Sequence, residues 1–355
     1  MNLGEGGGGP PAVEGVDTGD GWCPNTFSTG ENGPDGRKCP MSGTSGKTIL
    51  VLSDGKPGHV NQSIALARHL GCPFETVRVD FRNRPFKLLS YLLDRVGVYL
   101  PSLLRWDPSP EGPFSAVVSA GSETYYGNKI LARRHNVPSV AIMLPQGYRL
   151  DFDLIIAQDH DSPPVKKNIL TLPVNLCRVE PMGVFRPREG ERYAALVVGG
   201  PNRVFGFDRD RFREALDAIF SGFPDFRIVV ATSRRTPAEI EREIERYPFE
   251  ERFLFSRNPV NPIPDFLSAC EHVLITADST SMISEAVTFG RARIEILPLA
   301  TRGDTGKYGR MTGKLVELGC VHLFDGRPGT ANRKIDLAEA LGRVTIERCV
   351  PEDGG

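Results

Sequence analysis

Short apolar runs alternate with amphipathic stretches along most of the chain, from residue 47 to about residue 318. Apolar runs bounded by Gly and Pro predict buried strands, and the amphipathic stretches between them predict helices. Strands that alternate with helices build parallel sheets covered by helices on both faces. The pattern therefore predicts an α/β protein.

The elements fall into two series, separated near residues 183–191. In the first series we expect strands at 48–52, 74–79, 116–119, 139–143 and 154–157, with helices at 59–70 and 124–135. In the second we expect strands at 194–198, 227–231, 252–255, 272–276 and 293–297, with helices at 209–220, 237–246, 263–269, 282–289 and 306–318. Two such series predict two doubly wound domains that face each other across a cleft. The predicted domains cover 47–185 and 186–330, with a C-terminal helix and tail at 331–355.

Residues 1–46 differ from the rest because they are rich in Gly, Pro, Ser and Asp and have almost no apolar periodicity. A segment so poor in apolar residues cannot bury enough surface to offset its ordering entropy. We therefore expect a disordered N-terminal extension. Met41, just before the first predicted strand, is a candidate for the true start of the protein.

Charge and cysteine usage exclude several classes of function. The 43 basic and 44 acidic residues give a formal net charge of −1, which offers no electrostatic basis for nonspecific nucleic-acid binding. We find no apolar run long enough to span a bilayer and no signal peptide, so we expect a cytoplasmic protein. The 7 cysteines are scattered and form no Cys-x-x-Cys pair, which predicts reduced thiols and neither a disulfide framework nor a zinc site.

Ligands in doubly wound folds bind beyond the carboxyl ends of the strands, so function should lie in the loops that follow them. The first of these loops contains Asp54, Lys56, Gly58, His59 and Gln62. Its glycines let the backbone approach a ligand, and an imidazole can act as a general base near neutral pH. The spacing matches neither a P-loop nor a dinucleotide-binding turn. The alternative is a surface turn that leads into a helix.

Two further loops place glycines directly after a buried strand. Gly121 and Ser122 do so in the first domain, where helix capping explains the residues about as well as substrate contact does. Gly199 and Gly200, with Asn202 shortly after them, open the second domain. Paired glycines let the main chain pass close to a phosphate or a sugar, although a simple tight turn would use them too.

The loop after the next strand of the second domain reads Ser233, Arg234, Arg235, Thr236 and Pro237. Thr236 is a plausible N-cap with Pro237 at the first helical position. The two arginines bring cationic donors to the end of a buried strand, and arginine suits bidentate recognition of phosphate. A solvated pair of charges is the alternative.

The most informative junction of strand and helix lies at residues 276–286. An acid and three hydroxyl residues follow the strand at 278–281, and a second acid lies further into the helix. The candidate residues are Asp278, Ser279, Thr280, Ser281, Met282 and Glu285. The free N–H groups and the positive dipole end of a helix favour an anion such as phosphate. From inside the helix, Glu285 could reach a sugar or ribose hydroxyl. The alternative is an ordinary hydroxyl N-cap with polar neighbours.

Taken together, these loops resemble the mitochondrial-fission Elm-type family of bacteria and plants. The matching motifs are Asp-Gly-Lys-Pro-Gly-His-x-x-Gln at 54–62, Gly-Gly-Pro-Asn at 199–202, Ser-Arg-Arg-Thr-Pro at 233–237 and Thr-Ala-Asp-Ser-Thr-Ser-Met-Ile-Ser-Glu-Ala at 276–286. The resemblance covers about residues 47–326 and leaves out the N-terminal extension. The family is similar to GT-B glycosyltransferases, which implies two Rossmann-like domains with a nucleotide-sugar donor in the second.

The resemblance implies a transferase that moves a sugar from a nucleotide-sugar donor to a cell-envelope or lipid-linked acceptor. The donor diphosphate is expected at 278–282, at the Gly199–Gly200 turn and at the two arginines. The acceptor is expected at 54–62, with His59 or Asp54 as the base, and variation in acceptor contacts at 144–148. No cofactor and no metal are expected, since the sequence has no Asp-x-Asp motif. The alternatives are a nucleotide-sugar epimerase or hydrolase on the same fold, and a non-catalytic protein that organises membranes.

In an apolar segment at 85–106, apolar and aromatic residues alternate with Lys87, Arg95 and Arg105. It is too charged, and too broken by Pro101, to span a membrane. One interpretation is a segment that lies in the headgroup region, beside a lipid-linked acceptor, as in a peripheral enzyme on the inner face of the membrane. The other is a helix packed on the first sheet. Partial exposure of the segment would favour the membrane interpretation.

Overall fold

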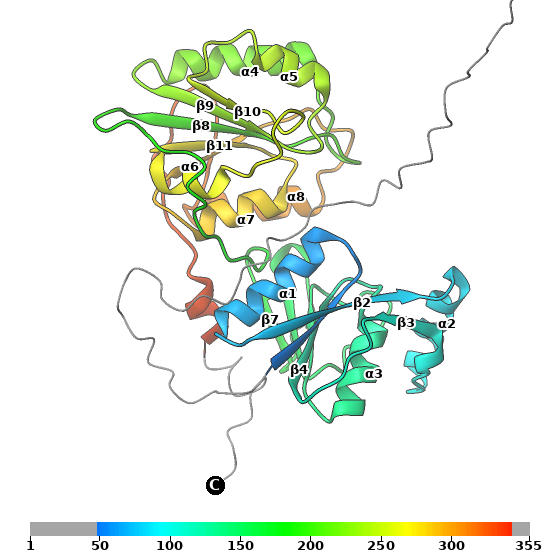
Figure 1. Cartoon of the computed structure of the whole chain (residues 1–355). Helices are drawn as coiled ribbons and strands as arrows, with labels where there is room; N and C mark the ends of the chain where they lie inside the picture. Colours follow the sequence, from blue (N-terminus) through cyan, green and yellow to red (C-terminus); the bar gives the residue numbers. More distant parts are fainter. Residues whose placement is uncertain (1–47, 343–355) are drawn as a thin grey trace, which may run out of the picture. The chain divides into compact units, whose positions relative to one another are not determined.

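The computed structural model describes residues 48–342, and its strands form two sheets (Figure 1). The first sheet has seven strands in the order β3-β2-β1-β4-β5-β6-β7. These strands are β1 (Thr48–Ser53), β2 (Phe74–Phe81), β3 (Leu104–Asp107), β4 (Phe114–Ala120), β5 (Ser139–Ile142), β6 (Leu154–Gln158) and β7 (Ile169–Leu172). All pairs are parallel except the edge strand β3, which runs antiparallel to β2.

The second sheet has six parallel strands in the order β10-β9-β8-β11-β12-β13. These strands are β8 (Tyr193–Val198), β9 (Arg227–Thr232), β10 (Glu251–Phe253), β11 (His272–Thr276), β12 (Arg293–Leu297) and β13 (His322–Leu323). Every residue of β8 and β11 is buried, as continuous apolar runs predict for strands covered on both faces.

Helices cover both faces of each sheet (Figure 1). On the first sheet, α1 (Pro57–His69) packs on one face, and α2 (Arg84–Arg95) and α3 (Tyr125–His135) pack on the other. On the second, α4 (Arg209–Gly222) and α5 (Ala238–Ile244) cover one face. The opposite face carries α6 (Ile263–Ala269), α7 (Thr280–Thr288) and α8 (Lys307–Glu317). Two short 3-10 turns, η1 (Pro101–Leu103) and η2 (Asp159–Asp161), complete the elements.

The predicted α/β class is confirmed, and both sheets contain the Rossmann order of strands. In each sheet the second and third strands lie on one side of the first strand. The chain then crosses over, and the remaining strands lie on the other side of the first strand. The crossing points lie between β1 and β4 and between β8 and β11. Doubly wound sheets bind ligands at such points, beyond the carboxyl ends of the strands. The candidate loops that follow β1, β4, β8 and β11 therefore lie where this fold class binds ligands.

The sequence analysis missed three strands and placed some helix starts too late. It did not predict β3, β7 or β13, which are short edge strands of two to four residues. Helix α1 begins at Pro57 and α7 at Thr280, each two residues earlier than expected. As a result, Gly58, His59 and Thr280 belong to first turns of helices.

The apolar segment at 85–106 forms more than one element of secondary structure. Its first half is α2, which packs on the first sheet and leaves several apolar side chains exposed, and its second half continues through η1 into β3. The packed-helix interpretation is therefore correct for α2, and the partial exposure that favours a membrane role is present as well.

Several sequence predictions lie outside the described residues. The N-terminal extension at 1–46 does so entirely, and the C-terminal helix and tail at 331–355 does so after residue 342. Among residues 48–342, no helix is long and apolar enough to cross a bilayer. The domain boundaries at 185 and 330 stay predictions.

Candidate active site

The loop after β1 contains a carboxylate that is hydrogen-bonded to an imidazole. Asp54 follows β1 directly, and His59 lies in the first turn of α1. Asp54 Oδ2 lies 2.9 Å from His59 Nδ1, and the Asp54 side chain is 1% exposed, against 24% for His59. A buried carboxylate thus holds an imidazole that still reaches solvent, which is the arrangement of a general base and the group that orients it.

The charge state of Asp54 decides which ring nitrogen can act. Burial by itself would raise the pKa of Asp54, but the hydrogen bond and charge of His59, together with bonds from Lys56, hold that pKa below its usual value. The Lys56 N–H donates to Oδ1, and Lys56 Nζ lies 3.1 Å from Oδ2. An ionised Asp54 accepts the Nδ1–H of His59 and leaves Nε2 to take up a proton. The geometry favours His59 as the base and Asp54 as its positioning residue.

Gly121 lets the loop after β4 close on His59. Its φ is 91°, and a Cβ at this position would lie 2.3 Å from His59 Nδ1, so any larger side chain would displace the ring. At Gly58, in contrast, a Cβ would meet nothing within 4 Å. The protein leaves space above the backbone of Gly58, where a ligand could approach.

Two side chains of the first domain that were predicted to contact a ligand, Gln62 and Ser122, form hydrogen bonds with other groups of the protein. Gln62 is buried, its Nε2 donates to Gly58 O, and its Oε1 accepts from Gln158 Nε2. The Ser122 hydroxyl accepts from Lys87 Nζ at 3.1 Å, and Lys87 also pairs with Glu123. Gln62 therefore braces the loop between α1 and β6, and Ser122 connects the β4 loop to α2.

In the second domain, Asp278 is the buried centre of the candidate site. It is 2% exposed and accepts hydrogen bonds from the Gly200 N–H at 3.0 Å and from the Thr276 hydroxyl at 2.7 Å. A Cβ on Gly199 would lie 2.2 Å from Asp278, and a Cβ on Gly200 would lie 2.1 Å from the Arg235 carbonyl oxygen. The paired glycines are thus required by the close packing of the protein itself.

This packing corrects the role predicted for the glycine pair. The Gly199 N–H donates to the Thr276 hydroxyl at 2.8 Å, and the Gly200 N–H donates to Asp278. Because both amides are used, they offer no free N–H to a phosphate. The tight-turn alternative describes these two amides better.

The two arginines of the 233–237 loop are not equivalent. Arg235 donates to Asp278 Oδ2 at 2.7 Å and to the Gly200 carbonyl at 3.0 Å, so its main partners lie within the protein. Arg234 is exposed, and no partner within residues 48–342 forms a hydrogen bond or an ion pair with it. Arg234 is therefore the arginine available to a phosphate, and Arg235 neutralises the buried carboxylate.

Two other residues predicted to bind the donor, Asn202 and Ser233, form hydrogen bonds within the loops of the protein. The Asn202 Oδ1 accepts from Val204 N and Phe205 N, and its Nδ2 donates to Asp278 O. The Ser233 hydroxyl accepts from Arg235 N. Each of these side chains shapes a turn.

Thr236 is not an N-cap, because α5 begins at Ala238 with Pro237 in the N-cap position. The Thr236 hydroxyl instead accepts from Ser233 N and faces the carbonyls of Val198 and Gly199 at the end of β8. Thr236 therefore ties this loop to the neighbouring strand.

The start of α7 carries the predicted helix-end features. Ser279 is the N-cap, and its hydroxyl accepts from the Met282 N–H at 3.4 Å. The Thr280 hydroxyl accepts from Asn175 Nδ2, and Ser281 is exposed. The first N–H groups of a helix have no partner within the helix, so the backbone of Thr280 and Ser281 can bind an anion.

Glu285 lies one turn further along α7 and stands apart from the other acids of the site. Its carboxylate has no hydrogen-bond partner among residues 48–342. Burial raises the pKa of Glu285 to about 7. A carboxyl group without a protein partner can bind a hydroxyl group, and the contact of Glu285 with a sugar or ribose hydroxyl stays a prediction.

Replacing Glu285 with Gln should stabilise the ligand-free protein at alkaline pH. The folded pKa of about 7 lies above the ordinary value of 4.5, so the folded state loses stability as the pH rises between these values and regains none above them. We expect Glu285→Gln to add roughly 1–3 kcal/mol to the free energy of unfolding at pH 8, and a gain that shrinks toward pH 4.5.

Urea denaturation across this pH range measures the effect. Glu239→Gln, at an exposed position of α5, is the matched control and should change little. An equal gain for both variants, or a gain independent of pH, would show that Glu285 is solvated.

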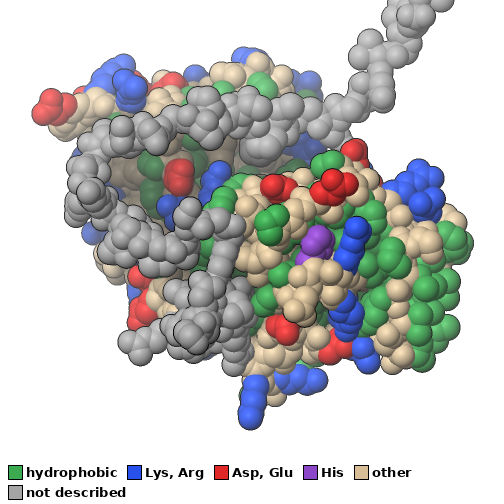
Figure 2. Space-filling model, turned by 60° about the horizontal axis from the view of Figure 1, so that its bottom comes forward, with side chains coloured by type: hydrophobic (Ala, Val, Ile, Leu, Met, Phe, Trp, Pro, Cys, Tyr) green, Lys and Arg blue, Asp and Glu red, His purple; other side chains and the backbone are tan. Residues whose placement is uncertain are grey.

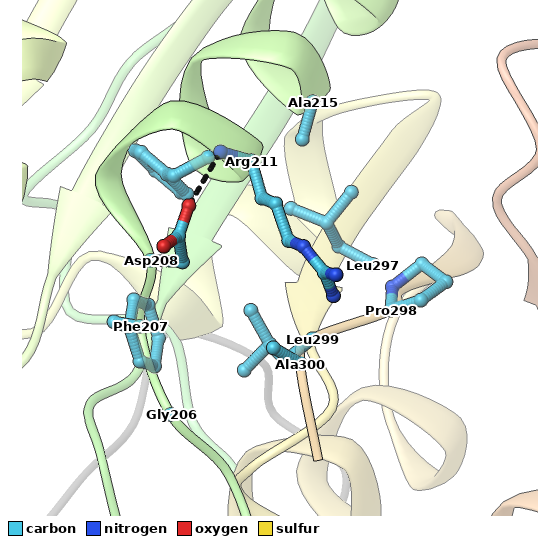
Figure 3. Close-up of a pocket in the computed structure, with 10 residues that line it drawn as sticks. Gly206, Phe207, Asp208, Arg211, Ala215, Leu297, Pro298, Leu299 and Ala300 are labelled. Carbon is cyan, nitrogen blue, oxygen red and sulfur yellow. Dashed lines mark hydrogen bonds between the residues drawn. The ribbon is translucent and has the colours of Figure 1, made fainter.

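Two pockets lie outside the predicted loops, and sequence reasoning missed both. One has a volume of about 190 Å³ between the start of α4 and the end of β12, where Figure 3 shows Arg211 extending past Asp208 toward Leu297. The other, of about 450 Å³, is lined by His69, Cys177 and Lys334 among others. The first is smaller than most ligand sites. Neither follows a recognisable motif, because each joins residues that are distant in sequence.

Comparison with known proteins identifies relatives of this chain. The chain is 26% identical over 291 residues to an uncharacterized protein of Rickettsia prowazekii (strain Madrid E), covering 68% of this chain and 81% of that protein. Among solved structures, it is similar to MurG of Acinetobacter baumannii (TM-score 0.44, 14% identity, 85% of this chain and 90% of that chain). It is also similar to the glycosyltransferase SnogD of Streptomyces nogalater (TM-score 0.46, 13% identity, 85% and 94%).

The family assignment rests on a family model. The family model described as mitochondrial fission ELM1 matches residues 57–345. The match includes the first candidate loop from Pro57 onward and all of the later ones. This chain belongs to the mitochondrial fission ELM1 family.

Proposed function

We propose that this protein is a glycosyltransferase that moves a sugar from a nucleotide-sugar donor to an acceptor hydroxyl. The observation that carries the proposal is the pair of polar loop clusters at the crossing points of the two sheets. One presents a base, His59, with a buried carboxylate behind it. The other presents the free start of a helix, the unpaired Arg234 and the partly buried Glu285.

The second cluster suits the donor. The first N–H groups of α7 and the guanidinium of Arg234 would bind the two phosphates, since helix ends and arginine both favour phosphate. Glu285 would accept a hydrogen bond from a ribose or sugar hydroxyl. The helix start and Arg234 supply positive charge to the departing diphosphate, and we propose that the reaction needs no metal ion and no cofactor.

The first cluster suits the acceptor. The acceptor oxygen attacks the anomeric carbon of the donor sugar while its proton passes to His59 Nε2. As the new carbon–oxygen bond forms, the bond from the anomeric carbon to the phosphate oxygen breaks, and the nucleoside diphosphate leaves with its electron pair. Asp54 holds the ring and stabilises the imidazolium that results. The acceptor that we propose is a lipid-linked or cell-envelope glycan, reached from the cytoplasm on the inner face of the membrane.

A thermal-shift series tests whether the donor site exists. We expect at least one nucleoside diphosphate to raise the melting temperature by several degrees, and the corresponding nucleoside to raise it far less, because a ligand stabilises with the logarithm of its excess over Kd. Donor consumed without an acceptor would identify an epimerase or a hydrolase instead. If none of the common nucleoside diphosphates shifts the melting temperature, the non-catalytic alternative is correct.

A further inference from the structure

Helix α2 buries two polar side chains and exposes a row of apolar ones, although Phe86, Tyr91 and Leu93 pack against the core. Ser90 and Asp94 are fully buried at 0% exposure, whereas Leu88 is 70%, Leu92 58% and Val96 66% exposed. Residues four apart lie on the same face of a helix, so these three apolar side chains form one stripe. A surface helix of a globular protein normally presents charged and polar side chains on its outer face, so an exposed apolar stripe is unusual.

Buried polar contacts fix α2 in this orientation. Asp94 accepts from Lys129 Nζ and from Arg149 N, both at 2.7 Å, and Lys129 is itself 1% exposed. The Ser90 hydroxyl bonds to Tyr148 Oη at 2.9 Å. Rolling the leucines inward would expose or break the buried Asp94–Lys129 pair, and removing the partner of a buried charge is strongly destabilising. The outward apolar stripe is therefore a fixed feature of the folded protein.

Further apolar side chains are exposed beside the stripe, within α2 and just past its end. Leu89 is 37% exposed, and Val98 and Leu100 are each 41% exposed. Figure 2 shows hydrophobic side chains gathered along the right-hand edge of the molecule, where α2 lies in Figure 1, with Lys and Arg side chains beside them. A contiguous exposed apolar patch of this kind marks an interaction surface.

The charge around the stripe identifies its partner. The segment 82–106 contains five cations and a single acid, Asp94, which is buried and paired. The cations are Arg82, Arg84, Lys87, Arg95 and Arg105. Apolar side chains beside basic ones suit the headgroup region of an anionic bilayer. A second copy of this chain would bring like charges together, which disfavours a dimer through the same face.

The length of α2 fits a position in the plane of the membrane. Its 12 residues span about 18 Å, well short of the roughly 30 Å of a hydrocarbon core. On the side toward the first sheet, Lys87 connects α2 to Ser122 and Glu123, and the same loop holds Gly121 against His59. The exposed stripe and the base thus belong to neighbouring, directly connected elements.

We propose that α2 docks this protein on anionic membranes, with the stripe of Leu88, Leu92 and Val96 inserted among the headgroups. The docked helix places the loop that carries His59 near the bilayer surface. If the proposed function is correct, on which this last step rests, the acceptor is a lipid-linked molecule presented by the same membrane.

Vesicle flotation without any nucleotide tests the docking surface. The wild-type protein should float with vesicles that mix phosphatidylglycerol into phosphatidylcholine, and more weakly with phosphatidylcholine alone. Leu88→Ser combined with Leu92→Ser should reduce binding by about tenfold or more, because both side chains lose their apolar contact with lipid. Arg84→Glu combined with Arg95→Glu should remove the preference for the anionic vesicles.

Matched controls separate docking from folding and from the donor site. Val316→Ser combined with Leu323→Ser, two exposed positions of the second domain, should leave flotation unchanged. Both serine pairs should keep the melting temperature and its shift by nucleoside diphosphate, so a failure of docking is distinguishable from a failure of the proposed function. The proposal is overturned if the wild-type protein floats with neither vesicle, or if Leu88→Ser with Leu92→Ser turns a dimer into a monomer without affecting flotation.

Discussion

Replacing His59 with Ala is expected to slow sugar transfer by about a hundredfold to ten-thousandfold and to leave the affinity for nucleoside diphosphate unchanged. The imidazole is the proposed base of the first cluster, since its Nδ1 bonds to Asp54 and its Nε2 has no hydrogen-bond partner among residues 48–342. The predicted donor groups lie in a different cluster, on α7 and the 233–237 loop. Loss of the ring therefore removes the proton acceptor without touching a phosphate contact.

The measurement is the turnover of transfer from the stabilising donor into a lipid extract. His69→Ala, at the other end of α1, is the matched control and should keep its activity. Asp54→Asn should also lose activity, because an amide cannot hold the ring in the same tautomer. Unchanged turnover in His59→Ala would remove His59 from the mechanism.

Replacing Arg234 with Ala should weaken nucleoside diphosphate binding by about tenfold to 150-fold, and nucleoside binding hardly at all. A hydrogen bond from a charged donor to phosphate contributes about 1.5–3 kcal/mol, and Arg234 is the unpaired cation of its loop. Calorimetric titration with both ligands measures the difference. Arg242→Ala, an exposed arginine on α5, should change neither affinity.

The neighbouring Arg235→Ala should behave differently from Arg234→Ala. Its guanidinium is bonded to the buried Asp278, so its loss leaves that carboxylate short of a partner and should cost roughly 1–3 kcal/mol of stability. Arg234→Ala should leave the melting temperature as in the wild type. Equal effects of the two variants on stability and on binding would show that the arginines are interchangeable.

The sequence predicted the sheets well because their signal is local. β8 is a continuous apolar run that ends at Gly199, and the apolar centre of β11 ends at Thr276, shortly before the chain turns into α7. Edge strands such as β13 bury little and have almost no pattern of their own. Their position depends on pairing with β12, which a single segment of sequence does not reveal.

The candidate site was harder to predict, because its contacts join residues that are far apart in the chain. Asp278 reaches Gly200 and Arg235 only because β8, β9 and β11 are neighbours in the sheet. The motifs identified the loops, yet the division of labour between Arg234 and Arg235 follows from these contacts. The outward stripe of α2 likewise depends on Lys129, which lies 35 residues from Asp94.

One calorimetric series tests the central claim, that donor binding and base catalysis belong to separate loop clusters. The nucleoside diphosphate that most stabilises the wild-type protein is titrated into the wild type, His59→Ala and Arg234→Ala. The account predicts equal Kd values for the wild type and His59→Ala, and a Kd at least about tenfold weaker for Arg234→Ala. A collapse of binding in His59→Ala, with binding retained in Arg234→Ala, would contradict it.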